Sequence, residues 1–198
     1  IKGETINEIT GAARVMREKA IGVKTNNELS IDTCGTGGDG SGTFNISTTV
    51  AILLAGAGLT VAKHGNRSVS SKSGSADVLE ALGVNLNLLP EQVENCLNTV
   101  NIGFLFAPQF HKAMKYAVKP RKELKMRTIF NVLGPLTNPA AVNYQVMGVY
   151  HPSLVLPLAN VLKNLGVKRA MVVNGDNSVD EFTLSGSNRV AYLHDGYI

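Results

Sequence analysis

The sequence predicts an α/β protein in which a mostly parallel sheet is flanked by helices. Three observations support this fold class. Strand-like apolar runs alternate with helical patterns along most of the chain. Glycine is abundant, with 20 residues among 198, whereas aromatic residues make up 6% and tryptophan is absent. Such a profile indicates loops that contact ligand through their backbone. In parallel sheets ligands bind outside the carboxyl ends of the strands, and the unusual loops of this chain follow predicted strands.

Each element has its own justification. A helix is predicted over residues 5–20, because Thr5 and Glu8 have the spacing of a capping box before an apolar face. Asn45 stands where it can cap an apolar helix that runs to Gly56 or Gly58. The other expected helices are 75–82, 90–99, 111–118 and 153–165. The expected strands are 29–33, 59–63, 145–150, 170–174 and 190–194, and a further short apolar run spans 102–106.

Composition excludes several classes of function. Two cysteines, Cys34 and Cys96, cannot build a disulfide framework, which favours a reducing, cytoplasmic setting. No Cys/His spacing is typical of a zinc site. The longest apolar stretch, residues 50–62, is too short to span a bilayer. The net charge of +4 comes from scattered basic residues without interleaved aromatics, so a small anionic substrate is favoured over nucleic acid.

The glycine-rich loop after the first strand is the first chemical motif. Five glycines between Gly35 and Gly42 allow the backbone to approach a ligand and to point its N–H groups inward. Such a nest before a helix N-terminus suits a phosphate or diphosphate, and a flexible turn is the plainer alternative. Gly35, Gly37 and Gly40 also satisfy G-x-G-x-x-G. A dinucleotide site is disfavoured, because the second strand ends in Lys63-His64 and not in an acidic residue. The Walker A pattern is absent.

Three further motifs follow predicted strands or helices. Residues 63–71 combine cations and hydroxyls that would complete an anion clamp, although a solvated surface loop is the alternative for Arg67 and Lys72. Asp180 and Glu181 follow an apolar strand and suit Mg²⁺, which prefers one or two carboxylates plus substrate oxygens; alone, such a pair is usually a solvated turn. In residues 121–139, Arg127 or Arg121 could grip a carboxylate, and the segment could equally be a helix that ends at Gly134-Pro135.

These blocks resemble the anthranilate phosphoribosyltransferase family. The matching segments occur in the family's order and spacing, and they are residues 35–40, 45–48, 63–71 and 127–139. The resemblance covers essentially the whole chain. It implies transfer of the phosphoribosyl group from 5-phosphoribosyl 1-diphosphate to the amine of anthranilate, with release of pyrophosphate and with Mg²⁺ as cofactor. A pyrimidine nucleoside phosphorylase-like enzyme and a non-catalytic nucleic-acid-binding relative are the alternatives.

The resemblance also implies roles for individual residues. The implied ligands of the phosphoribosyl diphosphate are Gly35, Gly38, Asp39, Thr43, Asn45, Ile46, Ser47, Thr48, Lys63, His64, Gly65, Asn66, Arg67, Ser68, Val69, Ser70, Ser71 and Ser75. The implied anthranilate ligands are Gly35, Asn66 and Arg121, with His64 and Pro135 nearby. Ser47, Asp180 and Glu181 would coordinate Mg²⁺. Lys63 would act on the leaving pyrophosphate, and Asp39 on the positive charge that grows on the ribose.

The family's fold is phosphoribosyltransferase/nucleoside phosphorylase-like, with a small helical domain beside an α/β domain and homodimers formed through the helical domain. Residues 1–24 would be a remnant of the small domain, residues 25–198 the diphosphate-binding domain, and about 122–137 would pack back on the helical domain. The chain opens at Ile1 inside a helical pattern, so we expect an interior segment of a longer protein. Residues 1–198 alone are therefore expected to be poorly active and impaired in native dimerisation.

One block departs from the family pattern. Where the family has His-Gly followed by Gly-Leu/Val-Asp-Glu, this chain has Asn174-Gly175 and then Ser178 before Val179. The two carboxylates are retained. Only the fine positioning of this loop is put in question.

Overall fold

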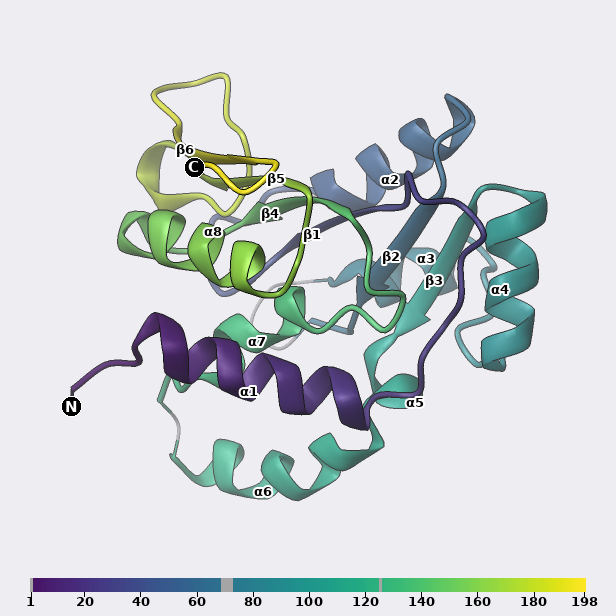
Figure 1. Ribbon diagram of the computed structural model, residues 1–198, viewed down its shortest axis with the longest axis horizontal. Helices are drawn as coiled ribbons and strands as arrows, with labels where there is room; N and C mark the ends of the chain where they lie inside the picture. The colour runs from purple at the N-terminus through teal and green to yellow at the C-terminus, as the bar shows by residue number, and fades with distance from the viewer. Residues whose placement is uncertain (1, 69–72, 125) are drawn as a thin grey trace.

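A single mixed sheet forms the centre of the protein. The computed structural model describes residues 2–68, 73–124 and 126–198. In that part of the chain the strands are β1 (Ile31–Gly35), β2 (Val61–Gly65), β3 (Ile102–Phe106), β4 (Tyr144–Gly148), β5 (Arg169–Asn174) and β6 (Arg189–His194). Their order is β3-β2-β1-β4-β5-β6, and each neighbouring pair is parallel except β5 and β6 (Figure 1). The predicted mostly parallel sheet is confirmed.

Helices cover both faces of this sheet. They are α1 (Ile6–Lys19), α2 (Ile46–Gly56), α3 (Ser75–Ala81), α4 (Pro90–Thr99), α5 (Ala107–Phe110), α6 (Lys115–Leu124), α7 (Phe130–Leu136) and α8 (Val155–Asn164), with short 3-10 turns at Lys112–Met114, Pro152–Leu154 and Asp176–Ser178. Because side chains alternate along a strand, Ile31 and Val61 pack under α2, whereas Ala62 faces α4 on the opposite side. The helical layers thus follow from the period of two in the strands.

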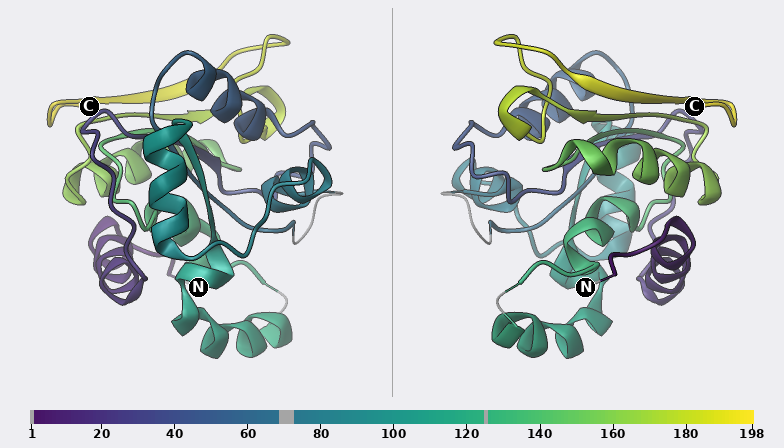
Figure 2. Two further views of the ribbon diagram at one scale, coloured as in Figure 1. Left: turned by 90° about the vertical axis from the view of Figure 1, so that its right-hand side faces the viewer. Right: turned by 90° about the vertical axis from the view of Figure 1, so that its left-hand side faces the viewer.

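Helix α1 packs on α7 and α8 and shares their core (Figure 1). Its buried residues Ile9 and Ala13 belong to the same cluster as Leu136 and the apolar face of α8. The predicted capping box is formed, since Thr5 N donates to Glu8 Oε2 at 2.8 Å and Glu8 N donates to Thr5 Oγ1 at 3.3 Å. Figure 2 shows the helix of residues 115–124 at the end of the molecule opposite the C-terminal strand.

Two strands are shifted by two residues from the sequence prediction, and the strand predicted at 145–150 ends two residues early, at Gly148. β1 was expected at 29–33 and β2 at 59–63, but both run two residues further toward the glycine-rich and polar loops. Leu29 and Leu59 remain 54% and 37% exposed, so the apolar residues that suggested each strand start lie before it. A shift of two residues keeps every side chain on its predicted face.

The region before α7 also differs from prediction. The helix expected at 111–118 is replaced by a 3-10 turn and by α6, which extends to Leu124, and the short α5 was not predicted. α7 includes Pro135 and ends at Leu136, close to the predicted boundary at Gly134-Pro135. None of the helices in the described residues is long and apolar enough to cross a membrane.

Candidate active site

The glycine-rich loop and the acidic turn meet at the carboxyl ends of β1 and β4. Asp180 Oδ2 accepts a hydrogen bond of 2.7 Å from Gly37 N, and Asp180 N donates to Asp39 Oδ2 at 3.3 Å. Gly37 and Gly38 have φ of +64° and +75°, in the left-handed region that glycine adopts without strain. The tertiary fold therefore brings together two motifs that lie far apart in the sequence.

The first turn of α2 reaches the same place. Ser47 N donates to Glu181 Oε1 at 3.2 Å, so the carboxylate of Glu181 occupies the helix N-terminus, where a negative charge is stabilised. The side-chain cap predicted for Asn45 is wrong: Asn45 lies at the N-cap position, but its amide Nδ2 donates instead to Ser73 Oγ at 3.1 Å. The carboxylate of Glu181, which is distant in sequence, takes the place of the side-chain cap that was expected from Asn45.

Lys63 lies beneath α2 and is only 1% exposed. Its Nζ donates to the Thr33 carbonyl at 2.7 Å and to Ser47 Oγ at 3.3 Å. Burial lowers the pKa of Lys63, and the nearby charge of Asp32 opposes that shift. The Lys63 ammonium group therefore does not line the site itself, but it contacts the site through its hydrogen bond to Ser47 and contributes its positive charge.

Asp32 and Asn138 form a buried hydrogen-bonded pair that was not predicted from the sequence to be functional. Asp32 accepts hydrogen bonds from His64 N at 3.2 Å and from Asn138 Nδ2 at 2.8 Å, and Asn138 Nδ2 also donates to the Ala62 carbonyl at 2.8 Å. Burial raises the pKa of Asp32 to about 6, although Lys63 opposes the rise. An aspartate inside a buried strand was the available clue, because an ionisable group is retained there only with partners.

Two glycines make room for Asp180 at the ends of β1 and β4. Gly35 pairs in register with Gly148. A Cβ on Gly35 would lie 2.5 Å from Asp180 Oδ2, and a Cβ on Gly148 would collide with the Asp180 carbonyl. Gly148 was not recognised from the sequence, since it lies at the end of an ordinary strand and its neighbour is brought in by the fold.

The carboxylates of the site carry unfavourable charge. Burial raises the pKa of Asp180 to about 6, with Asp39 adding to the rise, and burial raises the pKa of Glu181 to about 7, with Asp180 adding to it. Burial alone would also raise the pKa of Asp39, but hydrogen bonds from the Ser41 hydroxyl and amide hold it below the usual value. A cation placed among these groups would relieve their repulsion.

The acidic side chains do not form a complete metal cage. No group of three or more His, Cys, Asp or Glu side chains within residues 2–68, 73–124 and 126–198 is placed to hold a metal ion by itself. Mg²⁺ is commonly held by one or two carboxylates with water and substrate oxygens completing its octahedron. Asp180, Glu181 and the Ser47 hydroxyl match such a partial donor set.

The second predicted phosphate loop begins at the end of β2. Asp77 ties its base together, since Asp77 Oδ2 accepts from Ser68 N at 3.1 Å and from Gly74 N at 2.7 Å. The guanidinium of Arg67 pairs with Asp77 and Glu80 of α3 at 3.0 and 2.7 Å. Its side chain is thus engaged away from the acidic turn. Val69, Ser70 and Ser71 lie outside the described residues.

The predicted anthranilate side of the site begins at His64, at the end of β2. His64 Nδ1 lies 3.2 Å from the Gly134 carbonyl, and its ring centre lies 5.1 Å from that of His111. Burial and, to a smaller extent, the neighbouring His111 lower the pKa of His64 to about 3, so the ring is neutral at physiological pH. Arg121 belongs to α6, and its side chain lies outside the described part. The anthranilate assignments of Gly35, Asn66 and Arg121 remain predictions.

Comparison with known proteins identifies the family. The model of the a/b domain of the glycosyl transferase family matches residues 27–198. The chain belongs to this family. An anthranilate phosphoribosyltransferase from Petrotoga mobilis is 65% identical over 198 residues, which are 100% of this chain and 58% of that protein. The chain thus spans just over half the length of the curated relatives that it matches.

Two solved structures in the family are similar to this fold. The anthranilate phosphoribosyltransferase of Thermus thermophilus has a TM-score of 0.93 and 47% identity, covering 97% of this chain and 57% of that one. The anthranilate phosphoribosyltransferase of Saccharomyces cerevisiae, in complex with PRPP and Mg, has a TM-score of 0.87 and 32% identity, covering 96% of this chain and 55% of that one. Both likenesses extend over nearly all of this glycosyltransferase domain.

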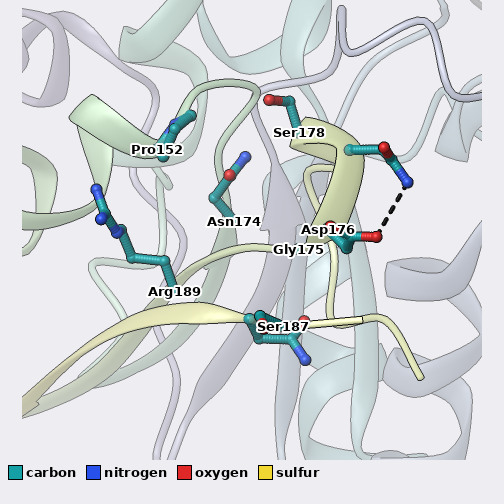
Figure 3. A pocket seen from close by; sticks show the side chains of 9 residues that line it. Pro152, Asn174, Gly175, Asp176, Ser178, Ser187 and Arg189 are labelled. Atoms are coloured by element: carbon teal, nitrogen blue, oxygen red, sulfur yellow. Dashed lines mark hydrogen bonds between the residues drawn. The ribbon is translucent and has the colours of Figure 1, made fainter. Parts of the chain in front are cut away.

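The turn that departs from the family pattern borders an open hollow (Figure 3). Its lining residues are Pro152, Asn174, Gly175, Asp176, Asn177, Ser178, Ser187, Asn188 and Arg189. None of them is a predicted substrate or metal residue, so the hollow is separate from the candidate active site. Asn174 Nδ2 donates to the Val149 carbonyl at 2.7 Å, and Gly175 N donates to the Val179 carbonyl at 2.8 Å. These bonds hold the turn that leads into Asp180.

Ser178 is strained in this turn, with φ of +61°. A left-handed conformation costs a non-glycine residue about 1–2 kcal/mol, while glycine gives back about 0.5–1 kcal/mol through the entropy of the unfolded chain. Ser178→Gly should therefore raise the free energy of unfolding slightly, by up to about 1 kcal/mol, in urea denaturation. Ser187→Gly is the matched control, because φ of Ser187 is not positive, and it should destabilise. Equal losses in both variants would show that Ser178 is not strained.

Proposed function

We propose that the protein carrying this chain transfers the phosphoribosyl group of 5-phosphoribosyl 1-diphosphate to the amine of anthranilate, with Mg²⁺ as cofactor. One observation carries the proposal: the Gly37 amide, the first turn of α2 and the Lys63 ammonium converge with Asp180 and Glu181 at one edge of the sheet. Amide groups, a helix N-terminus and a lysine suit an anionic diphosphate. Paired carboxylates beside them suit the metal that accompanies it.

Mg²⁺ is compatible with the residues present. Asp180 and Glu181 are like-charged, mostly buried neighbours, and burial together with nearby carboxylates raises their pKa values, so a cation bound between them would be stabilised. Asp180, Glu181 and Ser47 would hold the ion together with diphosphate oxygens. When bound, it would neutralise the charge that grows on the leaving diphosphate.

The chemistry that the chain's own groups perform follows from charge. A bond forms between the anthranilate nitrogen and C1 of the ribose, while the C1–O bond breaks and its electron pair leaves with pyrophosphate; the nitrogen then loses one proton to solvent. The loop N–H groups and the α2 N-terminus stabilise the developing charge, and Lys63 adds to this field from beneath Ser47. Asp39 is proposed to stabilise positive charge on the ribose. Because positioning can supply much of the acceleration, a strong general base is unnecessary.

Loss of anthranilate fluorescence tests the proposal in the full-length protein. We expect the signal to fall only when both 5-phosphoribosyl 1-diphosphate and Mg²⁺ are present, with pyrophosphate as the second product. Phosphorolysis of a pyrimidine nucleoside without anthranilate turnover would contradict the proposal and support a phosphorylase. DNA binding with a steep salt dependence and no turnover would support the non-catalytic relative.

The remaining family properties are proposals as well. Residues 1–24 and about 122–137 are proposed to belong to the side of a small helical domain, which is compatible with the packing of α1 against α7. A homodimer formed through that side and a cytoplasmic location are proposed on the same basis. Residues 1–198 alone are expected to bind diphosphate but to turn over poorly.

A further inference from the structure

Arg127 has an arrangement that a role as a carboxylate ligand does not explain. Its Nη2 donates to the Gly38 carbonyl at 2.7 Å. Its guanidinium lies over the ring of Tyr150, 3.9 Å from the ring centre. A guanidinium that stacks on an aromatic ring while donating a hydrogen bond is held in one plane and one direction. Arg127 thus acts on the glycine-rich loop in this structure.

The platform under Arg127 is tied to the base of the same loop. Tyr150 N donates to Thr36 Oγ1 at 3.0 Å, and Thr36 N donates to the Gly148 carbonyl at 3.0 Å. The stack is therefore fixed to the ends of β1 and β4, next to the acidic turn. Arg127 itself belongs to the connector between α6 and α7, so it joins this connector to the glycine-rich loop.

The bond to Gly38 fixes the direction of one peptide group. In a trans peptide the C=O and the next N–H point in opposite directions. When the Gly38 carbonyl is turned toward Arg127, the N–H of Asp39 points the other way. A flip of this peptide changes ψ of Gly38 and φ of Asp39; Gly38 has no Cβ to restrict its ψ, and aspartate is among the few non-glycine residues that also occur at positive φ. Without an external partner, this peptide could flip and present a carbonyl where the loop presents an amide.

We infer that Arg127 is a positioning residue that holds the Gly38–Asp39 peptide in the orientation needed to bind the diphosphate. This role rests on the proposed function for its substrate, but it assigns Arg127 to the diphosphate side and not to the anthranilate carboxylate. Tyr150 acts through Arg127, as its stacking platform. The connector between α6 and α7 is thereby coupled to the diphosphate loop.

Steady-state kinetics of the full-length protein distinguish a role of Arg127 in positioning the diphosphate loop from a role in binding the anthranilate carboxylate. Arg127→Met should raise the KM for 5-phosphoribosyl 1-diphosphate about tenfold, the loss expected for one strong hydrogen bond, and leave the KM for anthranilate within about twofold. The melting temperature should stay within about 2 °C, because the side chain is exposed. Arg189→Met is the matched control for lost charge and should leave both constants unchanged. A selective rise in the anthranilate KM would overturn the inference and make Arg127 the carboxylate ligand.

Tyr150 variants test the coupling. Tyr150→Leu should raise the same KM, whereas Tyr150→Phe, which keeps the ring, should not. The double variant Arg127→Met/Tyr150→Leu should be no worse than Arg127→Met alone, because both changes remove one interaction. Additive effects would overturn the inference, as would an Arg127→Lys variant that behaves like wild type, since charge alone would then suffice.

Calorimetric titration with pyrophosphate and Mg²⁺, without anthranilate, tests the role of Arg127 in diphosphate binding even if anthranilate is not the substrate. Weaker pyrophosphate binding by Arg127→Met supports the inference even if anthranilate is not turned over, in which case only the proposed function fails. Unchanged pyrophosphate affinity, or no binding by the wild type, overturns the inference.

Discussion

Gly148→Ala should abolish Mg²⁺-dependent pyrophosphate binding, because the new methyl group would collide with the Asp180 carbonyl. The obstacle is backbone and not the end of a flexible side chain, so the whole acidic turn must move. Gly148 also faces Gly35 across β1 and β4, which places the displacement directly beside the glycine-rich loop. We expect no detectable heat of pyrophosphate binding and a loss of about 1–3 kcal/mol in the free energy of unfolding.

Gly11→Ala is the matched control. Gly11 lies inside α1, and a Cβ there would meet no atom within 4 Å. Alanine in a helix interior is favoured over glycine by about 0.5–1 kcal/mol, so this variant should be more stable than wild type and bind pyrophosphate normally. Wild-type pyrophosphate affinity in Gly148→Ala would show that the position of Asp180 does not matter to the site.

The double variant Asp180→Asn/Glu181→Gln should lower kcat/KM at least about 10²-fold in the full-length protein, a loss comparable with removal of one group that stabilises transition-state charge. The amides keep the size of the carboxyl groups, and their oxygens can still accept from Gly37 N and Ser47 N. They cannot supply the negative charge that Mg²⁺ requires. The anthranilate fluorescence assay over a range of Mg²⁺ concentrations measures the effect.

The fold of this variant should survive. The pKa values of Asp180 and Glu181 are raised to about 6 and about 7, so the folded protein disfavours their charged forms, and neutral replacements should not lower the melting temperature near pH 7. Asp176→Asn, in the turn that precedes Asp180 but outside the site, is the control and should retain activity. Near-normal kinetics of the double variant at saturating Mg²⁺ would contradict the assignment of these carboxylates.

Local sequence determined the elements whose patterns are short-range. The capping box of Thr5 and Glu8 is formed, and the helix beginning at Pro90 starts where the proline predicts. The glycine-rich loop could be predicted as a phosphate site from local sequence, because close backbone access to a ligand requires glycine itself. The predicted starts of β1 and β2 were wrong by two residues, since exposed Leu29 and Leu59 resemble buried strand residues in sequence.

The residues that complete the site could not be found in this way. Glu181 replaces the side-chain cap expected from Asn45, and Arg127 binds the Gly38 carbonyl in place of a carboxylate. The need for glycine at position 148 is apparent only from its contact with Asp180, and the role of Asn138 only from its hydrogen bond to Asp32. In each pair the two residues are far apart in the sequence, and no local sequence pattern around one of them identifies the other as its partner.

By itself, the sequence determined the α/β fold class, and it predicted which residues bind phosphate and metal, because glycine, lysine and carboxylate chemistry is carried by single residues and their neighbours. Only the tertiary structure decided which backbone groups these residues satisfy and which glycines must lack a side chain. The physical reason is that hydrogen bonding and steric exclusion act over a few ångströms in space, whatever the separation along the chain.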